Sequence, residues 1–291
     1  MTVVAVVGLG TMGSRIAGRL LARGHRTLVW NRSAAPVEAL VRAGAVAAAS
    51  PAQAAGRADV VITMVTDGAA LHAVTTGADG VAAGASASTT VLQLSTVAPA
   101  DVSALAGALP AGTHLLDAPV LGSVAEAAAG TLKILAGGPA ATLTRAAPVL
   151  DDLGTTVHVG QLGAGTAAKL VANNALFGLV GVLGEALLLA RALGLEPDQA
   201  FETLAHTPLA EQAARRRPAI ESGQYPPRFA LHLASKDADL VADAARQGQV
   251  PLRLGAAARD WLADARAAGL GDADYTAVLG YMGLAPADAQ G

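Results

Sequence analysis

The sequence contains no cysteine among its 291 residues. This absence excludes disulfides, thiolate nucleophiles and metal sites built on cysteine, and it is compatible with a cytoplasmic protein. The histidines show no pairing at the spacing of metal ligands, so no metal site is predicted. These histidines are His25, His72, His114, His158, His206 and His232.

Aromatic residues are also scarce, at 3%, and charged residues make up only 15%. Because 53% of the residues are hydrophobic, the core must consist mainly of alanine, valine and leucine, which suits packed helices and buried parallel strands. A formal net charge of −3 provides no basic surface, so nucleic acid is not an expected partner. The G-x-S-x-G motif of serine hydrolases is absent as well.

Long apolar runs are few. Residues 3–7 have no basic residue before them and are followed at once by glycines, which favours a strand over a signal peptide. Residues 170–190 approach the length of a membrane span, but Asn173, Asn174 and Glu185 interrupt them. We expect this segment to be a buried helix, apolar on all sides, in a cytoplasmic protein without a membrane partner.

The first 160 residues alternate short apolar runs with alanine-rich segments. This alternation is typical of βαβ units, so we expect an α/β fold that begins with a doubly wound Rossmann domain over residues 1–162. The expected strands are 3–7, 27–30, 59–65, 90–94, 114–117, 132–136 and 156–159. Expected helices between them include 12–23, 34–43, 68–74 and 99–108.

From Gly163 onward the pattern is helical only, which predicts an all-α domain over residues 163–291. Its first helix, a long interdomain helix over 164–193, should end at Gly194, with Pro197 just beyond as a second stop signal. Further helices are expected over 197–205, 209–222, 229–247, 251–268 and 274–282.

A glycine-rich turn follows the first expected strand directly and opens a helix. In dinucleotide-binding proteins such glycines allow a tight turn, close approach to the pyrophosphate and close helix packing. The N–H groups of the helix N-terminus then face the phosphates. The alternative, a glycine turn without a ligand, is weaker in this context. The predicted cofactor-binding residues are Gly8, Leu9, Gly10, Thr11, Met12 and Gly13.

The second expected strand ends in Trp30, Asn31, Arg32 and Ser33. A carboxylate at this place would bind the ribose 2′-hydroxyl of NAD, and FAD sites usually have one too. The chain has a guanidinium between two small polar residues instead, which suits a phosphate. We therefore predict that NADP(H) is preferred and NAD(H) is possible, the alternative being a surface arginine in a turn.

Lys169 and Asn173 are four residues apart near the start of the long helix, so they lie on one face. A lysine desolvated in a cleft there would have a lowered pKa and could exchange a proton near neutral pH. The spacing alone is equally compatible with a solvent-directed lysine beside an exposed asparagine.

Several motifs together resemble the β-hydroxyacid dehydrogenase family, which includes 3-hydroxyisobutyrate dehydrogenases, and the resemblance spans essentially the whole chain. Its glyoxylate/succinic semialdehyde reductase branch is the most similar in the NRS turn at 31–33, in YPP at 225–227 and in GLGDADYTAV at 269–278. The family motifs are GLGTMG at 8–13, LSTVAP at 94–99, DAPV at 117–120, GTLKILAGG at 130–138, GAGTAAKLVANN at 163–174 and Lys236-Asp237.

The resemblance implies a role for each matching residue. Lys169 corresponds to the catalytic lysine, which protonates the carbonyl oxygen as hydride arrives, and Asn173 corresponds to a residue that orients substrate. The resemblance also implies contacts with the substrate carboxylate for Ser95, Gly122 and Ser123. It implies contacts with the nicotinamide end of the cofactor for Thr96 and Lys236. The adenosine and diphosphate of the cofactor would be bordered by Met64 and Val65. The family also implies that the helical domain over residues 163–291 serves substrate binding and dimerisation, in a homodimer or higher homo-oligomer.

Two departures from the family pattern fall in the implied substrate loop, where Leu121 replaces a serine and Glu126 begins Glu-Ala-Ala in place of Pro-Ala-Glu. The expected function is interconversion of a small aldehyde or keto acid (glyoxylate, succinic semialdehyde or 3-hydroxyisobutyrate type) and its hydroxy acid, with the substrate unassigned. One alternative is an imine reductase, although such enzymes commonly lack the lysine. The other is a non-catalytic NADPH-binding protein, although such a chain could have lost Lys169 and Asn173.

Overall fold

The structure is a computed structural model, and it describes residues 2–284. The chain divides into two compact units, Met1–Lys169 and Leu170–Gly291, and each is described by itself. The division falls within a long helix, α9 (Ala164–Ala192), whose first residue lies beside the predicted domain boundary.

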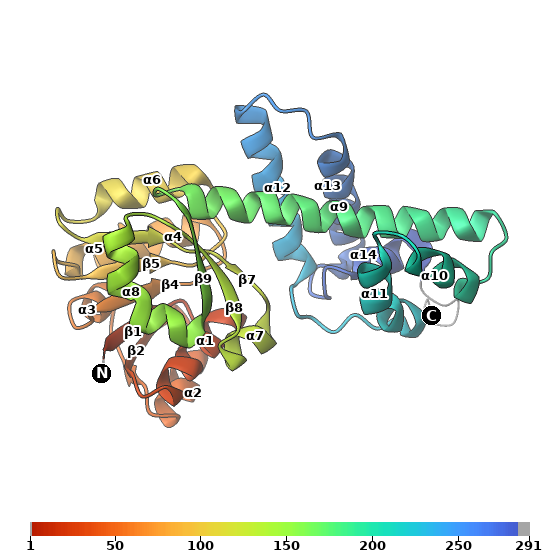
Figure 1. The fold of residues 1–291 in the computed structure, drawn as a ribbon. Helices are drawn as coiled ribbons and strands as arrows, with labels where there is room; N and C mark the ends of the chain where they lie inside the picture. Colours follow the sequence, from red (N-terminus) through yellow and green to blue (C-terminus); the bar gives the residue numbers. More distant parts are fainter. Residues whose placement is uncertain (1, 285–291) are drawn as a thin grey trace. The chain divides into compact units, whose positions relative to one another are not determined.

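The first unit is an α/β unit built on one sheet (Figure 1). Its strands run in the order β3-β2-β1-β4-β5-β6-β8-β7, and β9 pairs with β8. The pairs from β3 to β6 are parallel, as is β8 with β9, whereas β8 runs antiparallel to β6 and β7. The strands are β1 (Val3–Val7), β2 (Arg26–Trp30), β3 (Val46–Ala47), β4 (Val60–Thr63), β5 (Thr90–Gln93), β6 (His114–Asp117), β7 (Val120–Leu121), β8 (Leu132–Gly137) and β9 (Gly154–Gly160).

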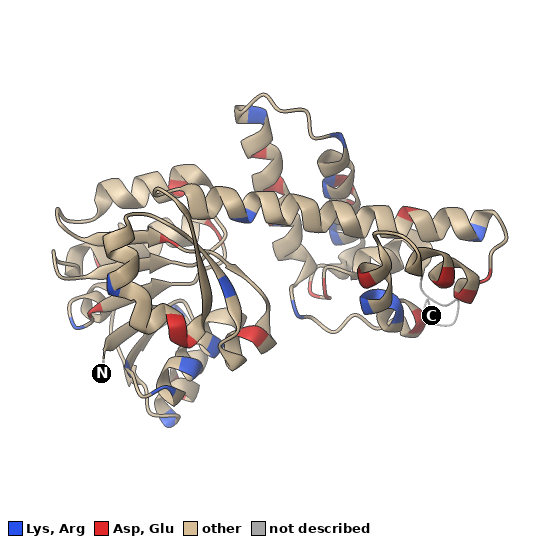
Figure 2. Cartoon of the chain, in the orientation of Figure 1, with Lys and Arg blue, Asp and Glu red and all other residues tan. Residues whose placement is uncertain are grey.

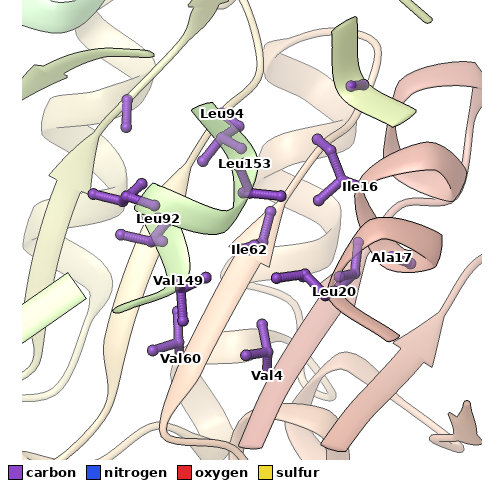
Figure 3. Packing of buried hydrophobic residues seen from close by; sticks show 14 of the residues in the cluster. Val4, Ile16, Ala17, Leu20, Val60, Ile62, Leu92, Leu94, Val149 and Leu153 are labelled. Atoms are coloured by element: carbon purple, nitrogen blue, oxygen red, sulfur yellow. The ribbon is translucent and has the colours of Figure 1, made fainter. Parts of the chain in front are cut away.

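Helices cover both faces of this sheet because its central strands are apolar on both faces. Alternate residues of β1 enter different cores: Val4 and Val6 pack in one, Ala5 and Val7 in the other. Figure 3 shows the first core, where Ile16 and Leu20 lie near strand residues. The helices are α1 (Thr11–Ala22), α2 (Ala34–Arg42), α3 (Pro51–Ala55), α4 (Gly68–Thr75), α5 (Val81–Gly84), α6 (Pro99–Ala108), α7 (Val124–Ala129) and α8 (Ala140–Leu153). The predicted Rossmann domain followed by helices is confirmed.

The second unit is helical within the described residues. Its core combines the buried face of α9 with apolar residues of the later helices, and Phe177, Phe229 and Tyr275 contact one another through their rings. The elements are α10 (Pro197–Ala205), α11 (Ala210–Ser222), α12 (Leu231–Gln247), α13 (Arg253–Ala265), a π-helical turn η1 (Arg266–Leu270), α14 (Ala277–Leu279) and a second π-helical turn η2 (Gly280–Leu284).

The last predicted helix, over 274–282, is wrong at its start and in its continuity. The Asp274 side chain accepts hydrogen bonds from the backbone N–H and the hydroxyl of Thr276, so a capped turn precedes α14. Within the predicted range, α14 ends at Leu279 and the π-helical turn η2 begins at Gly280, so no single α-helix continues to residue 282. The predicted helix 251–268 is also shorter, because α13 gives way to η1, where Gly269 has a φ of +92°.

Helix α9 corrects another expectation, because it is not buried on all sides. Leu170, Phe177 and Leu183 lie on its buried face, but Val171 is 71% exposed and Leu189 is 60% exposed. Within this helix, only 28% of the most apolar 18-residue stretch, which has a mean hydropathy of 1.8, is buried. By length and composition alone it is the one helix in the described residues that could cross a membrane. Figure 2 shows how few charged residues it carries, namely Lys169, Glu185 and Arg191.

Candidate active site

The glycine loop joins the end of β1 to α1, at the carboxyl end of the parallel strands. Gly8 has a φ of +95°, and a Cβ there would lie 2.3 Å from the Met64 carbonyl oxygen. A Cβ on Gly13 would lie 2.0 Å from the Gly8 carbonyl oxygen. These two glycines therefore let the loop, the helix and β4 approach closely, as the sequence predicts.

Gly10 has a different property, because a Cβ there would meet no protein atom within 4 Å. Gly10 is also the N-cap of the 12-residue helix α1 and makes no side-chain cap hydrogen bond. An open space before the positive end of a helix, bordered by backbone N–H groups, fits a pyrophosphate. The residues present thus fit a dinucleotide cofactor.

The turn after β2 is tied to this loop. The Leu9 N–H donates to Asn31 Oδ1 at 2.9 Å, and Asn31 Nδ2 donates to Ser33 Oγ at 2.8 Å. Arg32 lies between them and is exposed. The structure thus brings the predicted residues of the NRS turn beside the glycine loop, with a guanidinium where an NAD-specific site has a carboxylate.

The ends of β4 and β5 are joined by Ser95. The Val65 N–H donates to Ser95 Oγ at 2.9 Å, and Ser95 N donates to Gln93 Oε1 at 2.6 Å. Ser95 is only 1% exposed, whereas its neighbour Thr96 is half-buried. The Ser95 hydroxyl thus holds two strand ends together, and its predicted contact with substrate stays a prediction.

The start of α9 is held by a carboxylate to which the sequence analysis assigned no role. Asp117, the last residue of β6, is fully buried, and its two oxygens accept hydrogen bonds from the N–H groups of Gly163 and Thr166 at 2.8 Å and 2.7 Å. Burial raises the pKa of Asp117, and the hydrogen bonds from Thr166 and Gly163 oppose that rise. Its place at the end of a buried strand is the sequence signal that could have identified it.

One helical turn later, α9 carries Lys169 and Asn173. Asn173 is 1% exposed, and its Nδ2 donates to Asp237 Oδ2 at 2.8 Å. The Lys236 Nζ lies 2.7 Å from Asp237 Oδ1. Asp237 of α12 thus brings together two predicted site residues that are 63 positions apart in the chain, one for substrate and one for cofactor. The solvent-exposed alternative for Asn173 is excluded by its burial.

The predicted substrate loop lies between β7 and α7. Gly122 has a φ of +123°, a left-handed conformation that favours glycine. The Ser123 N–H donates to Glu126 Oε2 at 2.7 Å, in the manner of a helix capping box. This backbone amide, which the resemblance assigns to a substrate carboxylate, is therefore already bound to a carboxylate of the protein.

Two family models cover this architecture end to end. Residues 3–163 match the NAD binding domain of 6-phosphogluconate dehydrogenase, and residues 163–282 match the NAD-binding domain of NADP-dependent 3-hydroxyisobutyrate dehydrogenase. The chain belongs to the β-hydroxyacid dehydrogenase family. It is an NAD(P)-dependent dehydrogenase or reductase that acts on hydroxyl or aldehyde groups.

Individual members of the family are similar over nearly the full length. The 3-sulfolactaldehyde reductase of Escherichia coli K12 is 38% identical over 283 residues, which are 96% of this chain and 95% of that protein. A solved 3-hydroxyisobutyrate dehydrogenase of Mycobacterium tuberculosis with L-serine is 32% identical, has a TM-score of 0.89, and covers 97% of this chain and 99% of its own.

The branch that the motifs favoured also matches. Glyoxylate/succinic semialdehyde reductase 1 of Arabidopsis thaliana is 30% identical over 279 residues, which are 95% of this chain and 96% of that protein. Since relatives with three different named substrates share 30–38% identity with this dehydrogenase, overall identity does not select a substrate.

Proposed function

We propose that this dehydrogenase is an NADPH-dependent reductase of small aldehydes or keto acids, with Lys169 as proton donor. The observation that carries the proposal is the network in which Asp237 of α12 contacts both Lys236 and the buried Asn173, four residues after Lys169 on α9. A buried asparagine amide held by a carboxylate is pre-organised to orient a polar substrate. Lys169 is half-buried one turn before it.

The bound nicotinamide would supply or accept the hydride. The chain's own residues would then handle the proton and the orientation of the substrate. In the direction of reduction, the Lys169 Nζ gives a proton to the carbonyl oxygen, and in the reverse direction it takes the proton from the hydroxyl. Asp237 accepts a hydrogen bond from Asn173, which leaves the other amide hydrogen and the amide oxygen for the substrate.

We propose NADPH rather than NADH because of Arg32. This exposed guanidinium follows β2, and no carboxylate accompanies it in the turn 31–33. Asn31 holds the turn against the glycine loop through Leu9, so the turn has a fixed place beside the open space at Gly10. A guanidinium so placed can bind a 2′-phosphate with two parallel hydrogen bonds.

The loop 121–126 favours a substrate with a single carboxylate. Leu121 supplies an apolar side chain, and Glu126 brings a negative charge to the Ser123 amide. A short aldehyde acid with a single carboxylate, of the glyoxylate or semialdehyde type, suits this loop better than a dianion, which the Glu126 carboxylate would repel.

NADPH consumption with purified protein tests the proposal. The panel is glyoxylate, succinic semialdehyde, methylmalonate semialdehyde, 3-sulfolactaldehyde and a cyclic imine, each assayed with NADPH and with NADH. We expect the highest kcat/KM with NADPH and one of the aldehyde acids. Turnover of the imine alone would replace the proposal with imine reduction, and no turnover at all with tight NADPH binding would favour a non-catalytic protein.

The exposed face of α9 supports a homo-oligomer. Val171, Val182 and Leu189 are each more than 40% exposed on this helix, and several exposed apolar side chains on one element are typical of an interaction site. A second copy can cover it with the same helix face, as closed two-fold symmetry requires. We therefore propose a homodimer located in the cytoplasm. Recovery of the protein in the soluble fraction without detergent tests the location.

A further inference from the structure

Asp117 is an ionisable side chain in the interior of the first unit, so its burial requires a physical explanation. It ends β6 in the middle of the sheet, paired in register with Gln93 of β5 and Gly137 of β8, and it is fully buried. A buried carboxylate costs free energy unless donors surround it. Its two oxygens accept hydrogen bonds from the backbone N–H groups of Gly163, just before α9, and of Thr166 in the first turn of α9.

The two hydrogen bonds fix both the position and the rotation of that helix. The first helical hydrogen bond runs from Ala167 N to the Gly163 oxygen, so the N–H groups of Gly163 and Thr166 lie before the ladder begins. Asp117 accepts both of them, with one carboxylate oxygen each. Two attachment points separated by almost one turn prevent the first turn from rolling about its axis.

Close packing reinforces this attachment. A Cβ on Gly165 would lie 2.2 Å from the Asp117 carbonyl oxygen and 2.4 Å from the Leu135 carbonyl oxygen. A Cβ on Gly137 would lie 2.4 Å from Asp117 Oδ1. Backbone thus meets backbone without intervening side chains, so the helix start cannot move toward the sheet, and moving away would leave the carboxylate without donors.

We propose that Asp117 is a positioning residue for Lys169, which acts by fixing the angle at which the lysine leaves α9. Lys169 lies three residues after Thr166, and a helix rotates by a fixed step per residue, so the direction of the lysine follows from the anchored turn. The inference rests on the proposed function, because it assumes that Lys169 transfers the proton. No contact between Asp117 and Lys169 is required.

The test is a double-mutant cycle with Asp117→Asn and Lys169→Ala. Asparagine keeps the shape and one acceptor but turns an amide NH2 toward a backbone N–H. We expect Asp117→Asn to lower kcat roughly 10- to 100-fold, because small misplacements of reacting groups have effects of this size. The Kd for NADPH should change less than about twofold, since the glycine loop is untouched. In the Lys169→Ala background, the same substitution should leave the residual kcat unchanged.

The outcomes separate the inference from the proposed function. If Lys169→Ala retains wild-type kcat, the proposed function fails, and the inference fails with it. If Lys169→Ala abolishes turnover but Asp117→Asn keeps kcat within twofold, the inference alone is overturned. Equal losses from Asp117→Asn with and without the lysine would also overturn it, because Asp117 would then act independently of Lys169.

Two further variants distinguish the proposed effect on Lys169 from a general loss of folding. Ser50→Ala removes another helix cap of the same unit, where Ser50 Oγ accepts from Gln53 N at 3.1 Å, and it should leave kcat unchanged. Thr166→Pro deletes one donor instead of the acceptor, in a first turn where proline is tolerated. If Asp117→Asn does not fold, Thr166→Pro is judged by the same criteria, and wild-type kcat in that variant overturns the inference.

Discussion

Asp117 and Asp237 are both buried carboxylates, and each binds a different part of α9. Asp117 accepts from the helix start, whereas Asp237 accepts from Asn173 and pairs with Lys236. Side chains that transfer protons need defined geometry, and these two residues supply it on either side of Lys169 in the sequence. Neither was assigned a role from the sequence: the end of a buried strand marks Asp117 as a candidate, but hydrogen bonds to backbone or to distant side chains leave no local pattern that reveals the role.

At the same scale, Arg32 decides the proposed cofactor preference. Arg32→Ala should raise the Kd for NADPH about 10- to 100-fold and leave the Kd for NADH nearly unchanged, because only NADPH carries the 2′-phosphate. Fluorescence titration of both cofactors measures this. Arg26→Ala, at the other end of β2, is the matched control and should alter neither Kd. Equal weakening of both cofactors by Arg32→Ala would contradict the assignment.

At the scale of elements, the glycine loop separates structural glycines from a ligand glycine. Gly8 and Gly13 are required by the protein's own packing, whereas Gly10 faces open space. The motif implies this division, because its glycines serve a tight turn, close approach to the pyrophosphate and close helix packing. A side chain at Gly10 is therefore expected to leave the stability of the protein intact but to weaken cofactor binding.

Gly10→Ala should leave the melting temperature of the cofactor-free protein unchanged or slightly higher, and it should weaken NADPH binding by at least about tenfold, because its methyl group occupies the space of the pyrophosphate. Gly18→Ala, also in open space but within α1, is the control. It should stabilise the helix by about 0.5–1 kcal/mol without affecting binding. NADPH binding by Gly10→Ala with wild-type affinity would contradict a phosphate site there.

The elements that the sequence predicted correctly are the long or strongly apolar ones. The strand 3–7 and the helices 99–108 and 197–205 are confirmed with their bounds, since a continuous apolar run marks the strand and a proline at the start marks each helix. Short elements such as β3 and β7, with two residues each, were missed because they are strands only through their partners. The burial of α9 was overestimated because composition shows that a face is apolar but not whether anything covers it.

The site shows the same division. Motif spacing assigned the glycine loop and the 31–33 turn to one cofactor site, and the structure joins them through Leu9 and Asn31. The resemblance gave Asn173 and Lys236 roles at the active site, and the structure shows that Asp237 contacts both. It did not reveal that Glu126 binds the Ser123 amide or that Ser95 joins two strand ends, because these bonds depend on side-chain conformations. The secondary-structure propensity of a segment does not predict such side-chain contacts.

At the scale of the whole molecule, the uncovered face of α9 predicts self-association. Leu189→Lys places a charge within the proposed interface, so it should convert the dimer to a monomer at micromolar concentration, as measured by sedimentation velocity. Val41→Lys, at another exposed apolar position, on α2, should leave the assembly unchanged. A wild-type monomer would contradict the proposal, and so would a Leu189→Lys dimer of wild-type affinity.

The central claim is that the Lys169 amine transfers the proton. The most direct measurement compares kcat and the NADPH Kd of Lys169→Ala with those of Lys133→Ala, which removes an exposed lysine of β8. We predict that Lys169→Ala lowers kcat by roughly 10²- to 10⁴-fold with an unchanged Kd, as for loss of a general acid, and that Lys133→Ala changes neither. Undiminished kcat in Lys169→Ala, on a substrate that the wild-type enzyme reduces, would contradict the account.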